Sequence, residues 1–167
     1  MKKPITLFLF AFFLSFQASF AQFEVTGSID FGRIFDVTYD ANVPNKVYAV
    51  TMGNHIVVSE DNGANWEILY SLLIGQGASI KDLKLSPDGT ALTFSAYLPN
   101  TSFNEIRVYD IASATITKTF PLPNQSDAAY VSSYDFYDGD MDVLLVDTNF
   151  PVGISTEGKT FYTADGG

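Results

Sequence analysis

The side chains of this sequence that could do chemistry are mainly carboxylates. Asp138, Asp140 and Asp142 alternate ahead of an apolar run, and closely spaced carboxylate oxygens are ligands that Ca²⁺ prefers. The same segment contains an Asp-Gly pair, which is typical of a tight β-hairpin turn. Asn149 also stands where an EF-hand loop needs its bidentate glutamate. We therefore favour an acidic hairpin over a calcium site, and we expect no cofactor.

A second set of carboxylates could work as an acid and base pair. Asp36, Asp82 and Asp135 lie on predicted strands, and glycoside hydrolases use two carboxylates, one as the acid and the other as the base or nucleophile. In a chain with 19 acidic residues, however, neighbouring carboxylates are expected by chance, and no pair has a diagnostic spacing. His55 is the only histidine and cysteine is absent, which excludes a zinc site built from these ligands. The sequence therefore assigns no catalytic residue.

The N-terminal segment predicts export from the cell. Two lysines precede an apolar run over residues 5–16, and Ser19 and Ala21 supply the small residues that a signal peptidase requires before its cut. We expect a signal peptide over residues 1–21 and a mature chain over residues 22–167. The mature chain would be secreted or held at the cell surface, with no membrane insertion after cleavage. The lack of cysteine is more typical of a bacterial source.

The charge balance argues against two classes of partner. Without the predicted signal peptide the chain keeps seven Lys and Arg against 19 Asp and Glu, a formal charge of −12. Nucleic acids and anionic membranes both attract clusters of basic side chains, so neither is an expected partner. The absence of cysteine excludes a disulfide scaffold, so stability must come from a hydrophobic core.

Short β-branched and aromatic runs recur between turn signals, and no segment after the predicted signal peptide keeps a helical period over three turns. We predict an all-β chain. The runs also repeat, because Asp36, Asp82 and Ser133 occupy equivalent places at spacings of 46 and 51 residues. A repeat of this length with about four strands is typical of a β-propeller blade. The expected blades, the third of them incomplete, cover residues 30–71, 79–120 and 130–167.

One predicted turn has a motif with the spacing Ser/Thr-x-Asp-x-Gly-x-x-Trp. Its members are Ser59, Asp61, Gly63 and Trp66, and the pattern begins again in the third repeat at Thr163, Asp165 and Gly167. In such a turn the hydroxyl and carboxylate accept amide hydrogens, the glycine takes a positive φ and the indole packs beneath the turn. The motif resembles the Asp box of sialidases, sortilin-type receptors and many secreted bacterial propellers. That resemblance implies a β-propeller in which these residues are structural.

The resemblance extends only weakly to sialidase activity. A sialidase needs three arginines for the substrate carboxylate, an aspartate acid/base and a tyrosine nucleophile. The mature chain has only Arg33 and Arg107, and Phe35 stands where the sialidase motif has a proline. A sialidase would therefore have to take further arginines from other blades.

Ligand contacts are expected at the loops that join the second strand of a blade to the third and one blade to the next. Those loops contain Tyr97 and Phe103, and also Asn149 and Phe150 in a predicted loop over residues 147–151. Aromatic rings with amides nearby suit stacking on sugars and bonding their hydroxyls. The simpler alternative is that these aromatics pack the loops against the blades.

The predicted function is non-catalytic binding of an extracellular polysaccharide or protein by a secreted propeller. One alternative is an Asp-box glycoside hydrolase with catalytic residues partly in further blades, and another is a sortilin-like peptide receptor. Closed propellers use about four to eight blades, so three would leave two open apolar faces. We therefore expect the chain to be the N-terminal part of a longer protein, with self-association as the alternative.

Overall fold

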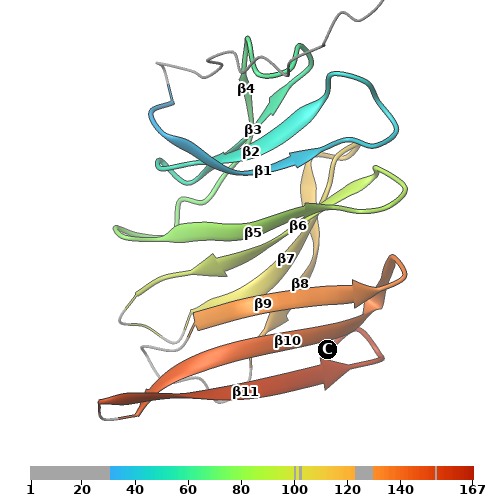
Figure 1. Cartoon of the computed structure of the whole chain (residues 1–167). Coiled ribbons are helices and arrows are strands. Elements are labelled where there is room, and N and C mark those ends of the chain that lie inside the picture. Colours follow the sequence, from blue (N-terminus) through green and yellow to red (C-terminus); the bar gives the residue numbers. More distant parts are fainter. Residues whose placement is uncertain (1–30, 100, 102, 123–129, 153) are drawn as a thin grey trace, which may run out of the picture.

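The computed structural model describes residues 31–99, 101, 103–122, 130–152 and 154–167. Within them the chain forms eleven β-strands and no helix, so this part of the chain contains no helix that could cross a membrane. The strands form three antiparallel sheets that stack in chain order (Figure 1). The all-β prediction is thus confirmed, while the predicted signal peptide lies outside the described residues.

The first two sheets are four-stranded meanders in which each strand pairs with the next along the chain. The first sheet contains β1 (Ile34–Tyr39), β2 (Val47–Thr51), β3 (His55–Ser59) and β4 (Glu67–Ser71). The second contains β5 (Ser79–Leu85), β6 (Ala91–Tyr97), β7 (Asn104–Asp110) and β8 (Thr115–Pro121). Asp36 on β1 and Asp82 on β5 both have a positive φ, 55° and 56°, at a shift in strand register. The two sheets therefore repeat in backbone geometry as well as in sequence spacing.

The third sheet has three strands among the described residues, in the order β11-β10-β9. They are β9 (Tyr130–Tyr137), β10 (Asp140–Val152) and β11 (Ser155–Thr163). The expected incomplete third blade is confirmed for this part of the chain.

The predicted loop over residues 147–151 was wrong, because these residues lie inside the long strand β10. Asn149 pairs with Gly158 of β11 on one side and with Tyr130 of β9 on the other. Asp, Asn and Pro are depleted in strands, but two neighbouring strands that pair along nearly the whole length of β10 override that local preference.

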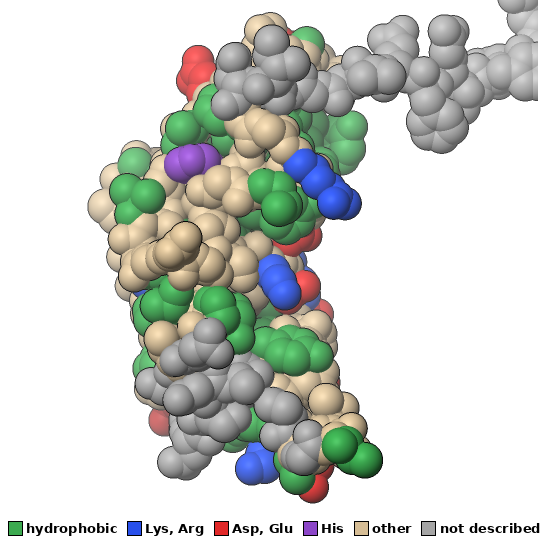
Figure 2. All heavy atoms as spheres, turned by 90° about the vertical axis from the view of Figure 1, so that its left-hand side faces the viewer, with side chains coloured by type: hydrophobic (Ala, Val, Ile, Leu, Met, Phe, Trp, Pro, Cys, Tyr) green, Lys and Arg blue, Asp and Glu red, His purple; other side chains and the backbone are tan. Residues whose placement is uncertain are grey.

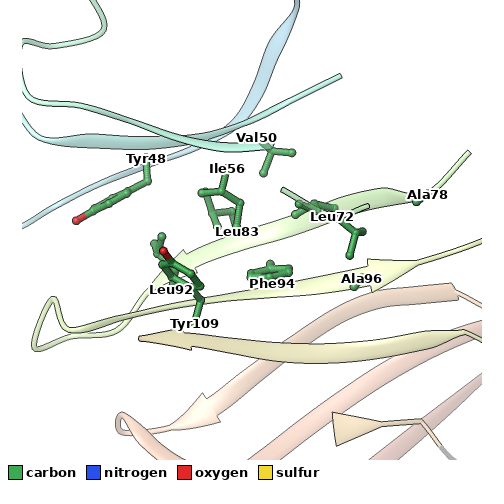
Figure 3. Close-up of a cluster of buried hydrophobic side chains, with 11 residues drawn as sticks. Tyr48, Val50, Ile56, Leu72, Ala78, Leu83, Leu92, Phe94, Ala96 and Tyr109 are labelled. Carbon is green, nitrogen blue, oxygen red and sulfur yellow. The ribbon is translucent and has the colours of Figure 1, made fainter. Parts of the chain in front are cut away.

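Two hydrophobic cores fill the spaces between the sheets. The first lies between the first two sheets, where Phe94 of β6 is completely buried among side chains of both sheets (Figure 3). The second lies between the second and third sheets, with Ile106 and Phe120 on one side and Leu144 and Val146 on the other. All of β2 and nearly all of β6 are buried, so these second strands form the interior of their sheets.

The first strands of successive sheets are also joined by polar contacts. The backbone N–H of Leu83 donates to the Asp36 carboxylate at 3.0 Å, which links β5 to β1. The Tyr134 hydroxyl donates to the carbonyl of Asp82 at 2.6 Å, which links β9 to β5, and it also bonds the Thr93 hydroxyl at 2.9 Å. Each sheet therefore fixes the first strand of its neighbour.

Three buried tyrosines make the free energy of unfolding fall at alkaline pH. Burial raises the pKa of the Tyr134 hydroxyl, and burial is also the main cause of the raised pKa of Tyr48 and Tyr109. The unfolded chain releases these protons near pH 10.0, whereas the folded chain holds them to higher pH. The free energy of unfolding is therefore maintained below about pH 10 and falls as pH rises above it.

Urea unfolding at a series of pH values measures this effect. Tyr134→Phe should flatten the fall above pH 10, while lowering the value at neutral pH by about 1 kcal/mol because the hydroxyl hydrogen bonds are lost. Tyr137, which is 72% exposed, provides the control, since Tyr137→Phe should leave the whole profile unchanged. Identical alkaline slopes for the natural protein and Tyr134→Phe would contradict the assignment to Tyr134.

Candidate binding face

One end of the stack gathers the loops in which ligand contacts are expected. This loop face consists of the β2–β3 turn (residues 52–54), the β4–β5 connector (residues 72–78) and the β6–β7 loop (residues 98–103, with 100 and 102 outside the described residues). The N–H of Leu72 donates to the carbonyl of Asn54 at 2.9 Å, so the connector is bonded to the turn. Gly75 and Gly77 of the connector lie beside Leu98 and Pro99 of the β6–β7 loop. Turn, connector and loop therefore form one surface.

The composition of the loop face suits a neutral ligand. The described residues of the turn, the connector and the loop include no charged side chain. In Figure 2, which views this end of the molecule, green and tan atoms cover more of the described surface than charged side chains do. Met52 is 64% exposed and Leu73 is 84% exposed, so apolar atoms meet solvent here. Because the chain is strongly acidic overall, a surface with few charges is a local feature of this end.

Tyr97 and Phe103, two of the predicted ligand residues, flank the β6–β7 loop. Tyr97 ends β6 opposite Asn104, and the N–H of Leu98 donates to the carbonyl of Phe103 at 3.1 Å, which closes the loop. Both residues are half-buried. Phe103 packs against the first core, and the Arg107 guanidinium lies 5.5 Å from the centre of its ring. The structure thus brings both aromatics to the loop face, each with part of its surface in solvent.

Asn149 and Phe150, the other two predicted ligand residues, belong to the interior of β10. Phe150 is only 7% exposed, and the Lys159 ammonium lies 4.8 Å from its ring centre. The Asn149 side-chain amide donates to the Ser132 hydroxyl of β9. Phe150 therefore serves packing, and the candidate face rests on Tyr97 and Phe103.

The structure adds a pair of residues that sequence reasoning missed. His55 begins β3, Ser71 ends β4, and the antiparallel register sets them opposite one another beside the loop face. The imidazole Nδ1 and the Ser71 hydroxyl are 2.7 Å apart. The register of β3 against β4 brings the two residues together. The sequence could therefore have indicated this contact only through the prediction that these two strands are neighbours. The pair offers a donor and an acceptor to a ligand hydroxyl.

The three acidic residues of the first strands do not form one cluster. The Asp135 carboxylate lies 3.2 Å from the Lys84 ammonium. Burial, and after it the nearby Asp36 carboxylate, raise the pKa of Asp82. Asp36 in turn accepts a backbone hydrogen bond. Asp36 and Asp82 are thus neighbours, whereas Asp135 forms an ion pair with Lys84.

The Asp138–Asp142 segment forms the hairpin turn that its sequence favours. Asp138 and Gly139 have φ values of 47° and 78°, and Tyr137 pairs with Asp140 across the turn. The Asp142 carboxylate binds the Lys118 ammonium. Over the described residues, no three His, Cys, Asp or Glu side chains are grouped as metal ligands.

The turn that follows β3 has the hydrogen bonds expected of its motif. The Ser59 hydroxyl donates to the Asp61 carboxylate at 2.8 Å and accepts the N–H of Gly63 at 2.7 Å, with Gly63 at a φ of 90°. Hydrogen bonds lower the pKa of Asp61 to about 2, and the bond from the Asn65 side chain contributes most. Trp66 follows, half-buried, and its indole N–H is buried without a hydrogen-bond partner among the described residues.

The turn after β11 has the same geometry. The Thr163 hydroxyl donates to the Asp165 carboxylate at 2.8 Å and accepts the N–H of Gly167 at 2.9 Å. These contacts match those of Ser59, atom for atom. The two turns differ in burial, since Ser59 is 1% exposed and Thr163 is partly exposed.

Comparison with known proteins shows the fold of the chain but does not assign the chain to a family. No family model and no curated protein matches the chain. Among solved structures, a GH74 xyloglucanase from Xanthomonas campestris is similar with a TM-score of 0.57 at 17% identity, over 80% of this chain and 20% of that one. A GH74 enzyme from Niastella koreensis gives 0.56 at 18% identity, over 86% and 22%. The tricorn protease gives 0.50 at 14% identity, over 77% and 12%.

These similarities confirm the predicted β-propeller fold. The chain spans about a fifth of the length of the two GH74 enzymes. At identities under 20% the likeness concerns the arrangement of sheets, and function must be argued from the residues of the site.

Proposed function

We propose that the chain belongs to a secreted β-propeller that binds a neutral extracellular polysaccharide through its loop face. The observation that carries this proposal is the position of Tyr97 and Phe103, two partly exposed rings that flank one loop on a surface with few charges. Aromatic rings stack on the apolar faces of sugars, while nearby polar groups bond the hydroxyls. The His55 and Ser71 pair supplies such groups at the same end.

The choice of a carbohydrate ligand over a protein ligand is part of this proposal and rests on the aromatic rings and the few charges of the loop face. Two of the similar solved structures are GH74 enzymes, and one of them is a xyloglucanase. Xyloglucan is a neutral polysaccharide, which agrees with a face that has few charged side chains. Export by the predicted signal peptide would place the protein where such polymers occur. The hydrogen bonds of the Ser59 and Thr163 turns support the assignment of both as Asp boxes, with a structural role.

A second candidate function is glycoside hydrolysis, favoured by the unequal carboxylates of the first strands. Asp82, with its raised pKa, suits a proton donor, and the nearby Asp36 carboxylate would be its partner in an acid and base pair. The sialidase version is disfavoured, because Arg107 already contacts Glu105 and the Tyr70 hydroxyl and is not available to a substrate carboxylate.

Further blades are part of the proposal. The first sheet exposes Val37, Tyr39 and Ile68, and the third exposes Leu145 and Tyr162, each between 50% and 68%. Such faces are covered by the neighbouring blade in a closed propeller. The intact mass of the exported protein tests this part, since the mass of residues 22–167 alone would contradict it and leave self-association.

Binding to soluble neutral polysaccharides tests the proposed function. Tyr97→Ala and Phe103→Ala should each weaken binding by about tenfold, because each removes a ring that stacks on a sugar. Tyr137→Ala is the matched control, since Tyr137 is an exposed aromatic beside the β9–β10 turn at the opposite end of the sheets. Affinity gels or calorimetry with xyloglucan and other neutral glucans provide the measurement.

The outcomes separate the two candidate functions. Equal losses in all three variants, or no binding to any neutral polysaccharide, would contradict a binding site at the loop face. Release of reducing ends that is lost in Asp82→Asn and in Asp36→Asn, with binding retained, would support the hydrolase instead.

A further inference from the structure

Arg107 is a largely buried cation between the first two sheets, on the strand that follows the β6–β7 loop. Its side chain is only 16% exposed. Side chains alternate along a strand, so Arg107 shares one face of β7 with Tyr109. The Tyr109 hydroxyl donates to the carbonyl of Leu69 on β4 at 3.0 Å. This face of β7 therefore meets the first sheet, and Arg107 lies between the two sheets.

The Arg107 guanidinium joins the Phe103 ring of the loop face to the first sheet. Its Nε–H donates to the Glu105 carboxylate at 2.5 Å, and its Nη1–H donates to the Tyr70 hydroxyl on β4 at 2.5 Å. The guanidinium carbon also lies 5.5 Å from the centre of the Phe103 ring. A planar guanidinium can donate along its edge and stack on a ring with its face, whereas a lysine ammonium is a point charge. These contacts together therefore require an arginine.

The backbone of Phe103 is held by other bonds than those that hold its ring. The N–H of Leu98 donates to the Phe103 carbonyl at 3.1 Å. The Thr101 hydroxyl donates to the Leu98 carbonyl at 2.8 Å and accepts the N–H of Phe103 at 3.1 Å. These bonds fix the shape of the loop, but they do not orient the ring. The ring is oriented by its packing against the first core and by its contact with Arg107.

We propose that Arg107 is a positioning residue of the loop face, which holds the Phe103 ring in the orientation that stacks on a sugar and does not itself touch the ligand. This inference rests on the proposed function. A ring that is oriented before binding loses less conformational entropy when the ligand arrives. Tyr70 is a firm anchor, because its ring centre lies 5.3 Å from that of the buried Phe94. The ion pair with Glu105 balances the charge of Arg107, which suits a face that binds a neutral polymer.

Calorimetric titration of the exported protein with xyloglucan tests the inference. Arg107→Lys keeps a positive charge near Glu105 but removes the planar group, and it should weaken binding by about fivefold. Tyr70→Phe keeps the ring in the first core and removes only the hydroxyl that anchors the guanidinium. It should weaken binding in the same direction, by about twofold.

A double variant separates positioning of the ring from a general structural role. If Arg107 acts through the ring, Arg107→Lys combined with Phe103→Ala should bind as weakly as Phe103→Ala alone. Lys118→Met is the matched control. Lys118 also bridges two sheets, since it binds the Asp142 carboxylate and lies 5.7 Å from the centre of the Phe120 ring. Asp142 lies beside the β9–β10 turn at the opposite end of the sheets, so Lys118→Met should leave the affinity unchanged.

The outcomes distinguish this inference from the proposed function. If Phe103→Ala weakens binding and Arg107→Lys does not, the inference is overturned and the proposed function stands. Losses that multiply in the double variant would also overturn the inference, because Arg107 would then act elsewhere than on the ring. No binding of the natural protein to any neutral glucan would overturn both together. If Arg107→Lys does not fold, Tyr70→Phe alone and combined with Phe103→Ala decides the same question.

Discussion

Replacing Phe94 with alanine is expected to lower the free energy of unfolding by about 4 kcal/mol. Phe94 is completely buried in the first core, and its ring centre lies 5.3 Å from that of Tyr70 on the neighbouring sheet. Removing the ring leaves a cavity between two sheets that cannot collapse, since hydrogen bonds hold both of them in place. Small domains have a total stability of about 5–15 kcal/mol, so this variant is expected to be near its unfolding threshold at 37 °C.

Urea unfolding followed by circular dichroism measures the loss, with Tyr137→Ala as the control. Tyr137 is an aromatic beside the β9–β10 turn that is 72% exposed, and its removal should cost less than about 1 kcal/mol. A loss in Phe94→Ala as small as that in Tyr137→Ala would mean that the first two sheets are not held together by this core. A loss confined to the second sheet, seen by hydrogen exchange, would mean that the sheets unfold separately.

The fold could be predicted because its determinants repeat along the chain. The equivalence of Asp36 and Asp82, taken from spacing alone, corresponds to two positive φ values at the same place in β1 and β5. Turn signals such as Asp138-Gly139 act locally, and the structure has the expected turn there. Features set by a repeat or by a local turn motif could thus be predicted from the sequence alone.

The candidate site could be predicted only in part, because it depends on pairing between distant segments. Tyr97 and Phe103 flank a short loop between two clear strands, and the structure brings both to the loop face. Asn149 and Phe150 stand in a polar segment that reads as a loop, but pairing with β9 and β11 makes it a strand. The contact of His55 with Ser71 depends on the register of β3 against β4, which no local pattern fixes.

Replacing Ser59 with alanine is expected to lower the free energy of unfolding by about 2–3 kcal/mol, a large loss for one oxygen atom. The hydroxyl is 1% exposed, accepts the amides of Asp61 and Gly63, and donates to the Asp61 carboxylate. Alanine would leave the buried Gly63 amide without its hydrogen-bond partner. The Asp61 carboxylate would also lose one of the bonds that lower its pKa, so its pKa should rise.

The Thr163 hydroxyl makes the same hydrogen bonds at a more exposed position. Comparing Thr163→Ala with Ser59→Ala therefore isolates the effect of burial. The Thr163 hydroxyl has equivalent bonds to the Asp165 carboxylate and the Gly167 amide, but these groups are exposed. Water can replace the lost oxygen there, so Thr163→Ala should cost less than about 1 kcal/mol. Urea unfolding of both variants gives the two losses. Equal losses would mean that the turn contributes through its hydrogen bonds alone, whereas the expected difference would show that burial of the Ser59 turn sets its contribution.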